Sequence, residues 1–219
     1  MWECLQIPEA LQPKFIALPG HSHKLNESCP DSMIAIAEML APEFTASEFQ
    51  IIGHSMGGYL IGSLLEIGLR PKKIGLFHSK LGADNNEKKE QRQRAIELVK
   101  ENKDLYIRTM IRNLFSSPSH LEEKINELIN GAQSITIHTI TQCHRAMMQR
   151  SNGIPLVDEL HIPTYYFAGG ADQSIPFAQI QLELDTLGPL AQLTYFEMLG
   201  HMGQWEQPSA VENWLHSLL

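Results

Sequence analysis

Short apolar runs alternate with longer amphipathic stretches along this chain. Most of the runs are bounded by turn-forming residues and contain aromatic or β-branched side chains, a pattern typical of buried strands. The predicted strands occupy residues 14–18, 49–52, 73–78, 162–168 and 193–198. Helical periodicity fills residues 32–40 and 59–66 between the first three strands. Strands that alternate with helices predict an α/β fold, with a mostly parallel sheet covered on both faces.

The middle of the chain has a different pattern. Residues 79–150 contain helical runs and no convincing strand. The predicted helices occupy residues 87–100, 104–114, 121–129 and 135–149. We therefore expect one core formed by residues 1–78 and 151–219, with a helical insertion between its two parts.

A glycine-rich motif follows the second predicted strand. Residues 53–58 are Gly53-His54-Ser55-Met56-Gly57-Gly58, and a helical run begins directly after them. A strand, Gly-x-Ser-x-Gly and a helix form the turn known as the nucleophile elbow, which exposes the serine hydroxyl. We expect side chains at Gly53 and Gly57 to clash with the neighbouring strand and helix. The alternative is a glycine-rich turn with an inert serine.

A serine nucleophile needs a base, and the base needs an acid that orients it. Asp172 lies in the loop after the strand at 162–168, and His201 follows the strand at 193–198. Active sites of open α/β sheets gather at such strand ends. The chain order Ser, Asp, His is the order that this elbow uses. Taken singly, Asp172 could be a turn-forming aspartate and His201 a capping or surface histidine.

Four segments together resemble the α/β-hydrolase superfamily, in the branch with a Gly-His-Ser-Met-Gly-Gly elbow. They are residues 18–22 (Leu-Pro-Gly-His-Ser), the elbow, residues 168–172 (Ala-Gly-Gly-Ala-Asp), and Gly200-His201-Met202 with Glu206 and Pro208. The resemblance implies an α/β-hydrolase fold in which residues 79–150 form a helical cap over the active site. It also implies a catalytic triad of Ser55, Asp172 and His201, with the backbone N–H of Met56 in the oxyanion hole.

The chain departs from the family at its N-terminus. The family has two or three strands before the Leu-Pro-Gly-His segment, and one of them carries an oxyanion-hole donor. Here 13 residues precede Lys14, and they look like the end of a helix. Either the natural protein begins upstream, so that this chain lacks its first strands, or the strand at 14–18 pairs directly with the elbow strand. In the second case Gly20 or His21 would offer the missing N–H.

Composition limits the class of protein. The chain of 219 residues, 43% hydrophobic and 19% charged, is typical of one soluble globular domain. Its net charge of −8 argues against a nucleic-acid partner. No stretch approaches the roughly 20 apolar residues of a membrane helix. The first residues lack the basic start and apolar core of a signal peptide, so we expect a cytoplasmic protein that does not contact a membrane.

Cysteine and histidine spacing favours neither a disulfide framework nor a metal site. The cysteines Cys4, Cys29 and Cys143 are odd in number and unpatterned, as reduced thiols of a cytoplasmic protein would be. Of ten histidines, only His21 and His23 are closely spaced, and no cysteine or acidic residue completes a ligand set. We therefore expect no metal and no cofactor.

The predicted cap differs in charge from the rest of the chain. Residues 79–150 carry 12 basic and 9 acidic side chains, against 5 and 16 elsewhere. The cap could attract anionic substrates, with Arg108 and Arg112 as the best candidates, or it could be a solvated helical surface with paired charges. Its apolar positions could line an acyl pocket or form the buried faces of helices. They are Leu105, Ile107, Met110, Ile111, Leu114, Phe115, Met147 and Met148.

These features favour transfer of an acyl group to water. The prediction is a carboxylesterase-like serine hydrolase that acts on a small-molecule ester or thioester. The serine argues against the dehalogenase and epoxide-hydrolase branches of the superfamily, which place a carboxylate at the elbow. The alternatives are a hydrolase-like binding or receptor protein with little or no turnover, and an inactive, N-terminally truncated form. Turnover distinguishes them.

Overall fold

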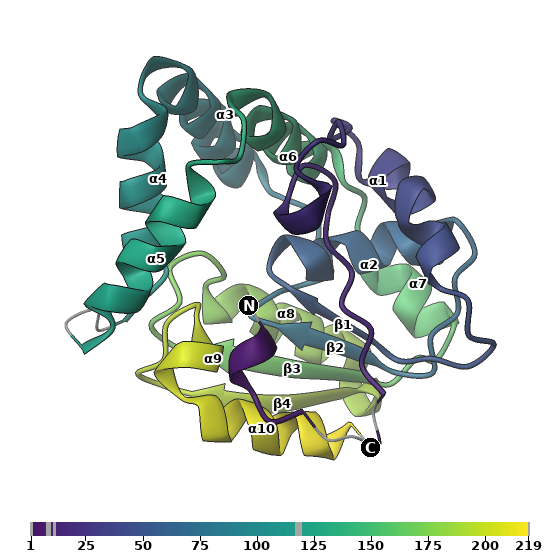
Figure 1. Ribbon diagram of the computed structural model, residues 1–219. Coiled ribbons are helices and arrows are strands. Elements are labelled where there is room, and N and C mark those ends of the chain that lie inside the picture. The colour runs from purple at the N-terminus through teal and green to yellow at the C-terminus, as the bar shows by residue number, and fades with distance from the viewer. Residues whose placement is uncertain (1, 8–9, 11, 117–119, 219) are drawn as a thin grey trace.

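The computed structural model describes residues 2–7, 10, 12–116 and 120–218. Its sheet has four parallel strands in the order of the sequence (Figure 1). They are β1 (Ile51–His54), β2 (Ile74–Phe77), β3 (Thr164–Gly169) and β4 (Ala191–Phe196). Because all four run in one direction, the residues that follow them gather at one edge of the sheet. Four of the five predicted strands are therefore confirmed.

Helices cover both faces of this sheet. Alternate residues of β2 point to opposite sides: Ile74 and Leu76 join one hydrophobic core, and Phe77 joins the other. The first core contains α1 (Met33–Leu40), α2 (Met56–Glu66), α7 (Ile154–Glu159) and α8 (Phe177–Leu187). The second contains α10 (Pro208–Ser217), whose Trp214 packs on the sheet, together with Trp2 and Leu5 near the N-terminus. The short helix α9 (Gly203–Glu206) precedes α10.

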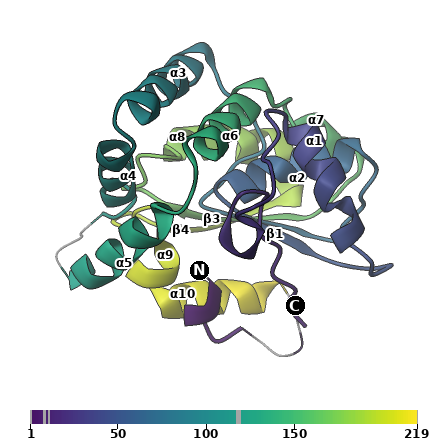
Figure 2. The same cartoon turned by 45° about the horizontal axis from the view of Figure 1, so that its top comes forward.

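The four helices predicted for the middle of the chain are present. They are α3 (Asn86–Glu101), α4 (Lys103–Arg112), α5 (Glu122–Ala132) and α6 (Ile137–Gln149). They form an arch beside the sheet (Figure 2). Asn85, Asn102 and Thr136 cap three of these helices, since each side chain accepts a backbone hydrogen bond. The arch reaches the segment that carries His201, because the His201 N–H donates to the Leu114 carbonyl at 2.7 Å.

A buried ion-pair cluster lies at the base of the arch. Asp84 precedes α3 and Arg150 follows α6, and the two side chains form an ion pair of 2.9 Å. Arg92 of α3 binds the other carboxylate oxygen of Asp84. The Arg150 guanidinium lies 3.9 Å from the centre of the Tyr59 ring on α2. The cluster therefore joins both ends of the inserted helices to the core.

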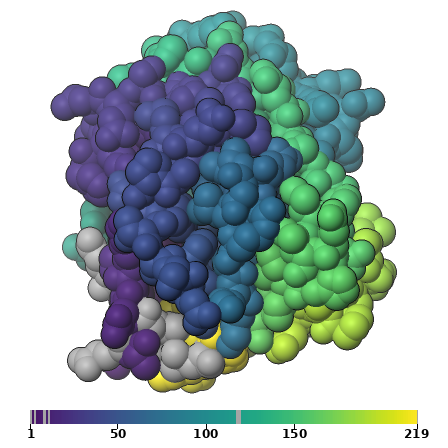
Figure 3. All heavy atoms as spheres, turned by 90° about the vertical axis from the view of Figure 1, so that its right-hand side faces the viewer, coloured from purple at the N-terminus to yellow at the C-terminus, as the bar shows by residue number. Residues whose placement is uncertain are grey.

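The predicted strand at 14–18 is wrong. Residues 12–18 belong to no strand, and β1 has no neighbour on its outer side among the described residues. A groove of about 630 Å³ separates this segment from β1. Figure 3 shows the segment in purple beside the blue residues that lead into β1. A strand needs a partner backbone at hydrogen-bonding distance, and residues 12–18 pair with no described strand, so the direct pairing with the elbow strand does not occur.

The predicted helix end at the N-terminus is reduced to one turn. Trp2–Cys4 form a short 3-10 helix, and residues 12–19 have no helix or strand. Another 3-10 turn, Ser22–Lys24, follows the Leu-Pro-Gly-His segment.

Candidate active site

Ser55 lies at the sharp turn between β1 and α2. Its φ of 51° and ψ of −118° are unusual for a residue with a side chain, and such strain is found at functional turns. The Ser55 N–H donates to the Phe77 carbonyl at 3.1 Å. Its own carbonyl accepts hydrogen bonds from the N–H of Gly58 and the hydroxyl of Ser79. The neighbouring loop therefore fixes the turn that the motif predicts.

Only one of the two motif glycines is sterically required. A Cβ added to Gly53 would lie 2.3 Å from the backbone nitrogen of Gly58, whereas a Cβ on Gly57 would meet nothing within 4 Å. The expected clash at Gly57 is therefore wrong, because this residue borders the groove beside β1. The second position that requires glycine is Gly58, because a Cβ there would lie 2.2 Å from Ser79 Oγ.

Asp172 and His201 are hydrogen-bonded to each other. His201 Nδ1 lies 2.7 Å from Asp172 Oδ2, and the two residues are 2% and 4% exposed. The other oxygen, Oδ1, accepts the backbone N–H groups of Ser174 and Ile175 at 2.8 and 3.0 Å. Burial would raise the pKa of Asp172, but the charge and hydrogen bond of His201, with a further hydrogen bond from His78, outweigh it and hold this pKa well below its usual range. Asp172 is therefore a carboxylate that orients His201.

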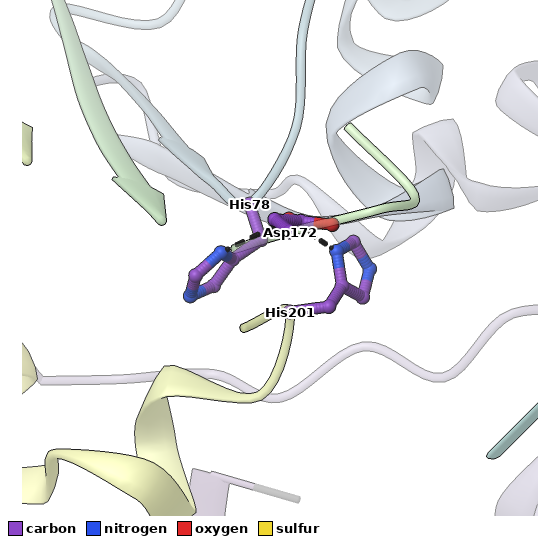
Figure 4. A group of neighbouring side chains, drawn as sticks. All are labelled: His78, Asp172 and His201. Atoms are coloured by element: carbon purple, nitrogen blue, oxygen red, sulfur yellow. Dashed lines mark hydrogen bonds and ion pairs between the residues drawn. The ribbon is translucent and has the colours of Figure 1, made fainter. Parts of the chain in front are cut away.

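His78 is an additional member of this cluster that the sequence analysis missed. Its Nδ1 lies 3.3 Å from Asp172 Oδ2, and the ring is fully buried (Figure 4). Burial lowers the pKa of His78, and the hydrogen bond to Asp172 opposes that effect only in part. The signal was available, because His78 follows β2 at the same sheet edge as the other site residues.

His54 connects the elbow to the segment that carries His201. Its Nε2 lies 3.2 Å from the His201 carbonyl oxygen, and the two rings are 5.1 Å apart. Burial, reinforced by the nearby His201 and His78, lowers the pKa of His54 well below its usual value. The neutral ring donates to the carbonyl. This contact brings the residue next to Ser55 against His201.

Ser55 Oγ makes no hydrogen bond to any described residue, so the bond to His201 is not formed here. The N–H of Met56 opens α2 and has no acceptor among the described residues, so it is available to an oxyanion. The proposed second donors are already used. Gly20 N–H donates to the Lys24 carbonyl at 2.9 Å, and His21 N–H donates to the Leu18 carbonyl at 3.1 Å.

The cluster of His78, Asp172 and His201 has the composition of a metal site, with ligand atoms within 4.8 Å of one another. Its hydrogen bonding argues against that role. A histidine that binds a metal through one nitrogen donates a proton from the other. His78 Nε2 instead accepts the N–H of Gly203 at 3.3 Å, so its proton is on Nδ1 and points at Asp172. The cluster is a hydrogen-bond network.

The arginines proposed to bind anions are in surface ion pairs. Arg108 pairs with Asp104 and Arg112 with Glu122, each at 2.7 Å and each well exposed. The apolar positions of the same helix divide by face: Ile107 is buried, whereas Leu105 is 49% exposed. Both observations match the alternative of an ordinary amphipathic helix.

Two further observations concern the thiols and the membrane. Cys29 and Cys143 are buried free thiols whose sulfur atoms lie 3.6 Å apart, and Cys4 is exposed. Within the described part of the chain, no helix has the length and apolar character needed to span a bilayer.

No protein-family model and no curated protein sequence matches the chain. Solved structures do. An esterase from Exiguobacterium antarcticum is similar at a TM-score of 0.79 and 16% identity, over 92% of this chain and 78% of that one. A bromoperoxidase from Bacillus anthracis has a TM-score of 0.77 and 13% identity, over 90% of this chain and 78% of that one. A hydrolase from a Medee basin deep-sea metagenome library has a TM-score of 0.69 and 15% identity, over 84% of this chain and 69% of that one. At these identities the likeness shows a shared fold.

Proposed function

From the α/β-hydrolase fold that this chain adopts, we propose that it is a serine hydrolase of small-molecule esters or thioesters, with Ser55 as nucleophile, His201 as base and Asp172 as the orienting acid. This fold is the one that the sequence motifs predicted. The observation that carries the proposal is the 2.7 Å hydrogen bond between Asp172 and His201, at the sheet edge where Ser55 occupies a strained turn.

The hydrogen bonding supports the following roles in the proposed reaction. His201 Nδ1–H donates to Asp172, so Nε2 carries a lone pair and accepts the Ser55 proton while Oγ attacks the carbonyl carbon. The Met56 N–H stabilises the resulting oxyanion. His201 returns the proton to the leaving alcohol or thiol as the bond to it breaks. Water, deprotonated by His201, then attacks the acyl-enzyme, and Ser55 regains its proton as the acid leaves.

The reaction requires Ser55 Oγ to rotate toward His201 Nε2. Catalytic hydrogen bonds are often long or unformed without substrate and tighten in the complex. We propose that α3–α6 act as a cap, because Leu114 contacts the His201 backbone. The buried thiols Cys29 and Cys143 support the cytoplasm, a reducing compartment, as the place of action.

A second candidate function rests on the oxyanion hole. Gly20 and His21 use their N–H groups within their own loop, which leaves the Met56 N–H as the candidate donor in the described part of the chain. Loss of one oxyanion donor costs about 100- to 1,000-fold in rate. The second candidate is therefore a hydrolase-like protein that binds or is acylated by its ligand and turns it over very slowly.

Labelling by a fluorophosphonate probe, followed by peptide mass spectrometry, tests the proposal. We expect modification of Ser55 in the wild type and in the control Ser217→Ala, an exposed serine on α10, and none in Ser55→Ala. A panel of p-nitrophenyl esters then separates the two candidates. Steady turnover supports the hydrolase, and labelling with a single burst supports the binding protein. A folded wild type without label at Ser55 would refute the hydrolase and the acylated form of the second candidate.

A further inference from the structure

His78 joins the two segments that carry Asp172 and His201. Its Nδ1 is 3.3 Å from Asp172 Oδ2, and its Nε2 is 3.3 Å from the backbone nitrogen of Gly203, two residues after His201. Figure 4 shows the His78 and His201 rings on either side of the Asp172 carboxylate, each joined to it by an interaction. The rings of the two histidines are 5.5 Å apart.

The partners of His78 fix its tautomer. Gly203 N–H can only donate, so Nε2 must accept and the single ring proton must lie on Nδ1. Nδ1–H then donates to Asp172 Oδ2, the same oxygen that accepts from His201. With the backbone N–H groups of Ser174 and Ile175 on Oδ1, the carboxylate has four donors, which matches its usual capacity.

Packing alone does not require a histidine at this position. The ring contacts Phe77 and Phe167 edge to face, with centroids 4.6 and 5.4 Å away. A buried polar ring costs free energy unless both nitrogens are hydrogen-bonded, and a phenylalanine would fill the same space without that cost. A Cβ at position 203 would lie 2.7 Å from His78 Nε2. Glycine at this position therefore lets the backbone N–H approach the ring closely enough to donate to it.

We propose that His78 is a positioning residue for the reaction: it shares Asp172 Oδ2 with His201, fixes the carboxylate, and limits how strongly Asp172 stabilises protonated His201. This inference rests on the proposed function of Ser55, Asp172 and His201. A neutral donor on Oδ2 withdraws part of the negative charge from the Asp172–His201 hydrogen bond. Without that donor, the carboxylate becomes more basic and holds a proton on His201 more tightly.

The ionisable groups that face His78 are Asp172, His201, Glu206 and His54. Burial lowers the pKa of His78, and the Gly203 N–H already occupies Nε2, the nitrogen that would have to take up a proton. A change in the pH profile on substitution of His78 therefore reports on His201 and not on titration of His78.

Two variants separate hydrogen bonding from packing. His78→Phe keeps a planar ring and loses both polar contacts. His78→Asn places an amide N–H near the position of Nδ1, and asparagine tolerates the φ of 45° found there. For His78→Phe we expect kcat to fall by about 10- to 100-fold, the loss of one hydrogen bond to a charged group, with little change in KM. The acid limb of the kcat/KM profile should move up by about half a pH unit to one unit.

His78→Asn should bring the acid limb back to the wild-type position and recover most of kcat. If both variants lose activity in proportion to their loss of thermal stability, with an unmoved acid limb, His78 is structural and the proposal fails.

Nitrogen-15 NMR of the histidine rings tests the same point without turnover. We expect the His78 ring of the wild type to be a neutral Nδ1–H tautomer at neutral pH, and we expect the ring signals of His201 to differ from wild type in His78→Phe but not in His78→Asn. A wild type that shows these signals without labelling at Ser55 would refute the proposed function and leave the network intact. An Nε2–H or cationic His78 at neutral pH would overturn the inference itself.

Discussion

The hydroxyl of Ser79 donates a 2.7 Å hydrogen bond to the backbone carbonyl of Ser55. The two residues follow neighbouring strands, β2 and β1. The same hydroxyl would lie 2.2 Å from a Cβ at position 58. Ser79 can therefore hold the carbonyl of the elbow only while residue 58 is glycine.

Replacement of Gly58 by alanine should disrupt the elbow, whereas the same change at Gly57 should not. A methyl group on Gly58 must displace Ser79 or the start of α2, at a cost of about 1–3 kcal/mol in the free energy of unfolding. Gly57→Ala is the matched control, because nothing lies within 4 Å of its Cβ. Urea unfolding and probe labelling of Ser55 check both variants. Equal losses of stability would show that the close approach at Gly58 has no effect.

Asp172→Asn should lower kcat by about four orders of magnitude without unfolding the protein. Because Asp172 Oδ1 accepts two backbone N–H groups, the asparagine carbonyl oxygen keeps that position and its NH2 group faces His201 Nδ1. An NH2 group can only donate, so it favours the tautomer that carries the His201 proton on Nε2. That tautomer cannot deprotonate Ser55. Asp185→Asn, on the exposed side of α8, is the control and should keep wild-type kcat in the p-nitrophenyl ester assay. A kcat of Asp172→Asn within tenfold of wild type would remove Asp172 from the mechanism.

Local patterns predicted most of the fold. The strands β1–β4 and the helices α3–α6 carry their own periodicity, and the elbow carries its own motif, so each could be recognised without knowledge of its neighbours. Residues 14–18 have an equally apolar pattern. Strand formation there depends on a partner backbone far away in the sequence, and no local pattern reports whether that partner is present.

The site was predicted less completely for the same reason. Asp172 and His201 follow strands with clear loops and were found. His78 also follows a strand, but its role comes from contacts with Asp172 and Gly203, which lie 94 and 125 residues later. The alternative in which Gly20 or His21 offers the second oxyanion N–H is not supported, because both N–H groups donate within their own turn, to Lys24 and Leu18. Residue types do not encode this detail of local geometry.

Asp84→Asn should strongly destabilise the attachment of α3–α6. The side chain of Asp84 is buried between Arg92 and Arg150, so its neutralisation leaves two buried guanidinium groups without their counter-charge. Removal of one partner from a buried ion pair costs about 3–5 kcal/mol. Asp104→Asn, which breaks an exposed ion pair with Arg108, should change the free energy of unfolding far less, because solvent screens the charges of an exposed pair. Urea unfolding compares the two, and a similar loss in both would contradict a stabilising role for the buried cluster.

His144 makes stability depend on pH. It is 8% exposed, and its Nε2 lies 2.8 Å from the hydroxyl of Tyr106. Burial raises the pKa of Tyr106 to about 12, so that hydroxyl donates its proton to Nε2. Burial, reinforced by the charge of Arg92, lowers the pKa of His144 to about 4. In the unfolded chain a histidine pKa is about 6.5.

Between these two values the unfolded state binds a proton that the folded state does not. The contribution of neutral, buried His144 to the free energy of unfolding is therefore fully present above pH 6.5 and is lost as the pH falls toward 4. We expect this group alone to make the free energy of unfolding about 2 kcal/mol smaller at pH 5 than at pH 7.5. The glutamine of His144→Gln can still accept from Tyr106 and does not titrate. The difference in the free energy of unfolding between pH 5 and pH 7.5 should therefore shrink by that amount. His138→Gln, at an exposed position of the same helix, should keep the wild-type difference. Urea unfolding of the three proteins at both pH values is the test, and an identical pH dependence in His144→Gln and wild type would show that His144 takes up its proton equally in both states.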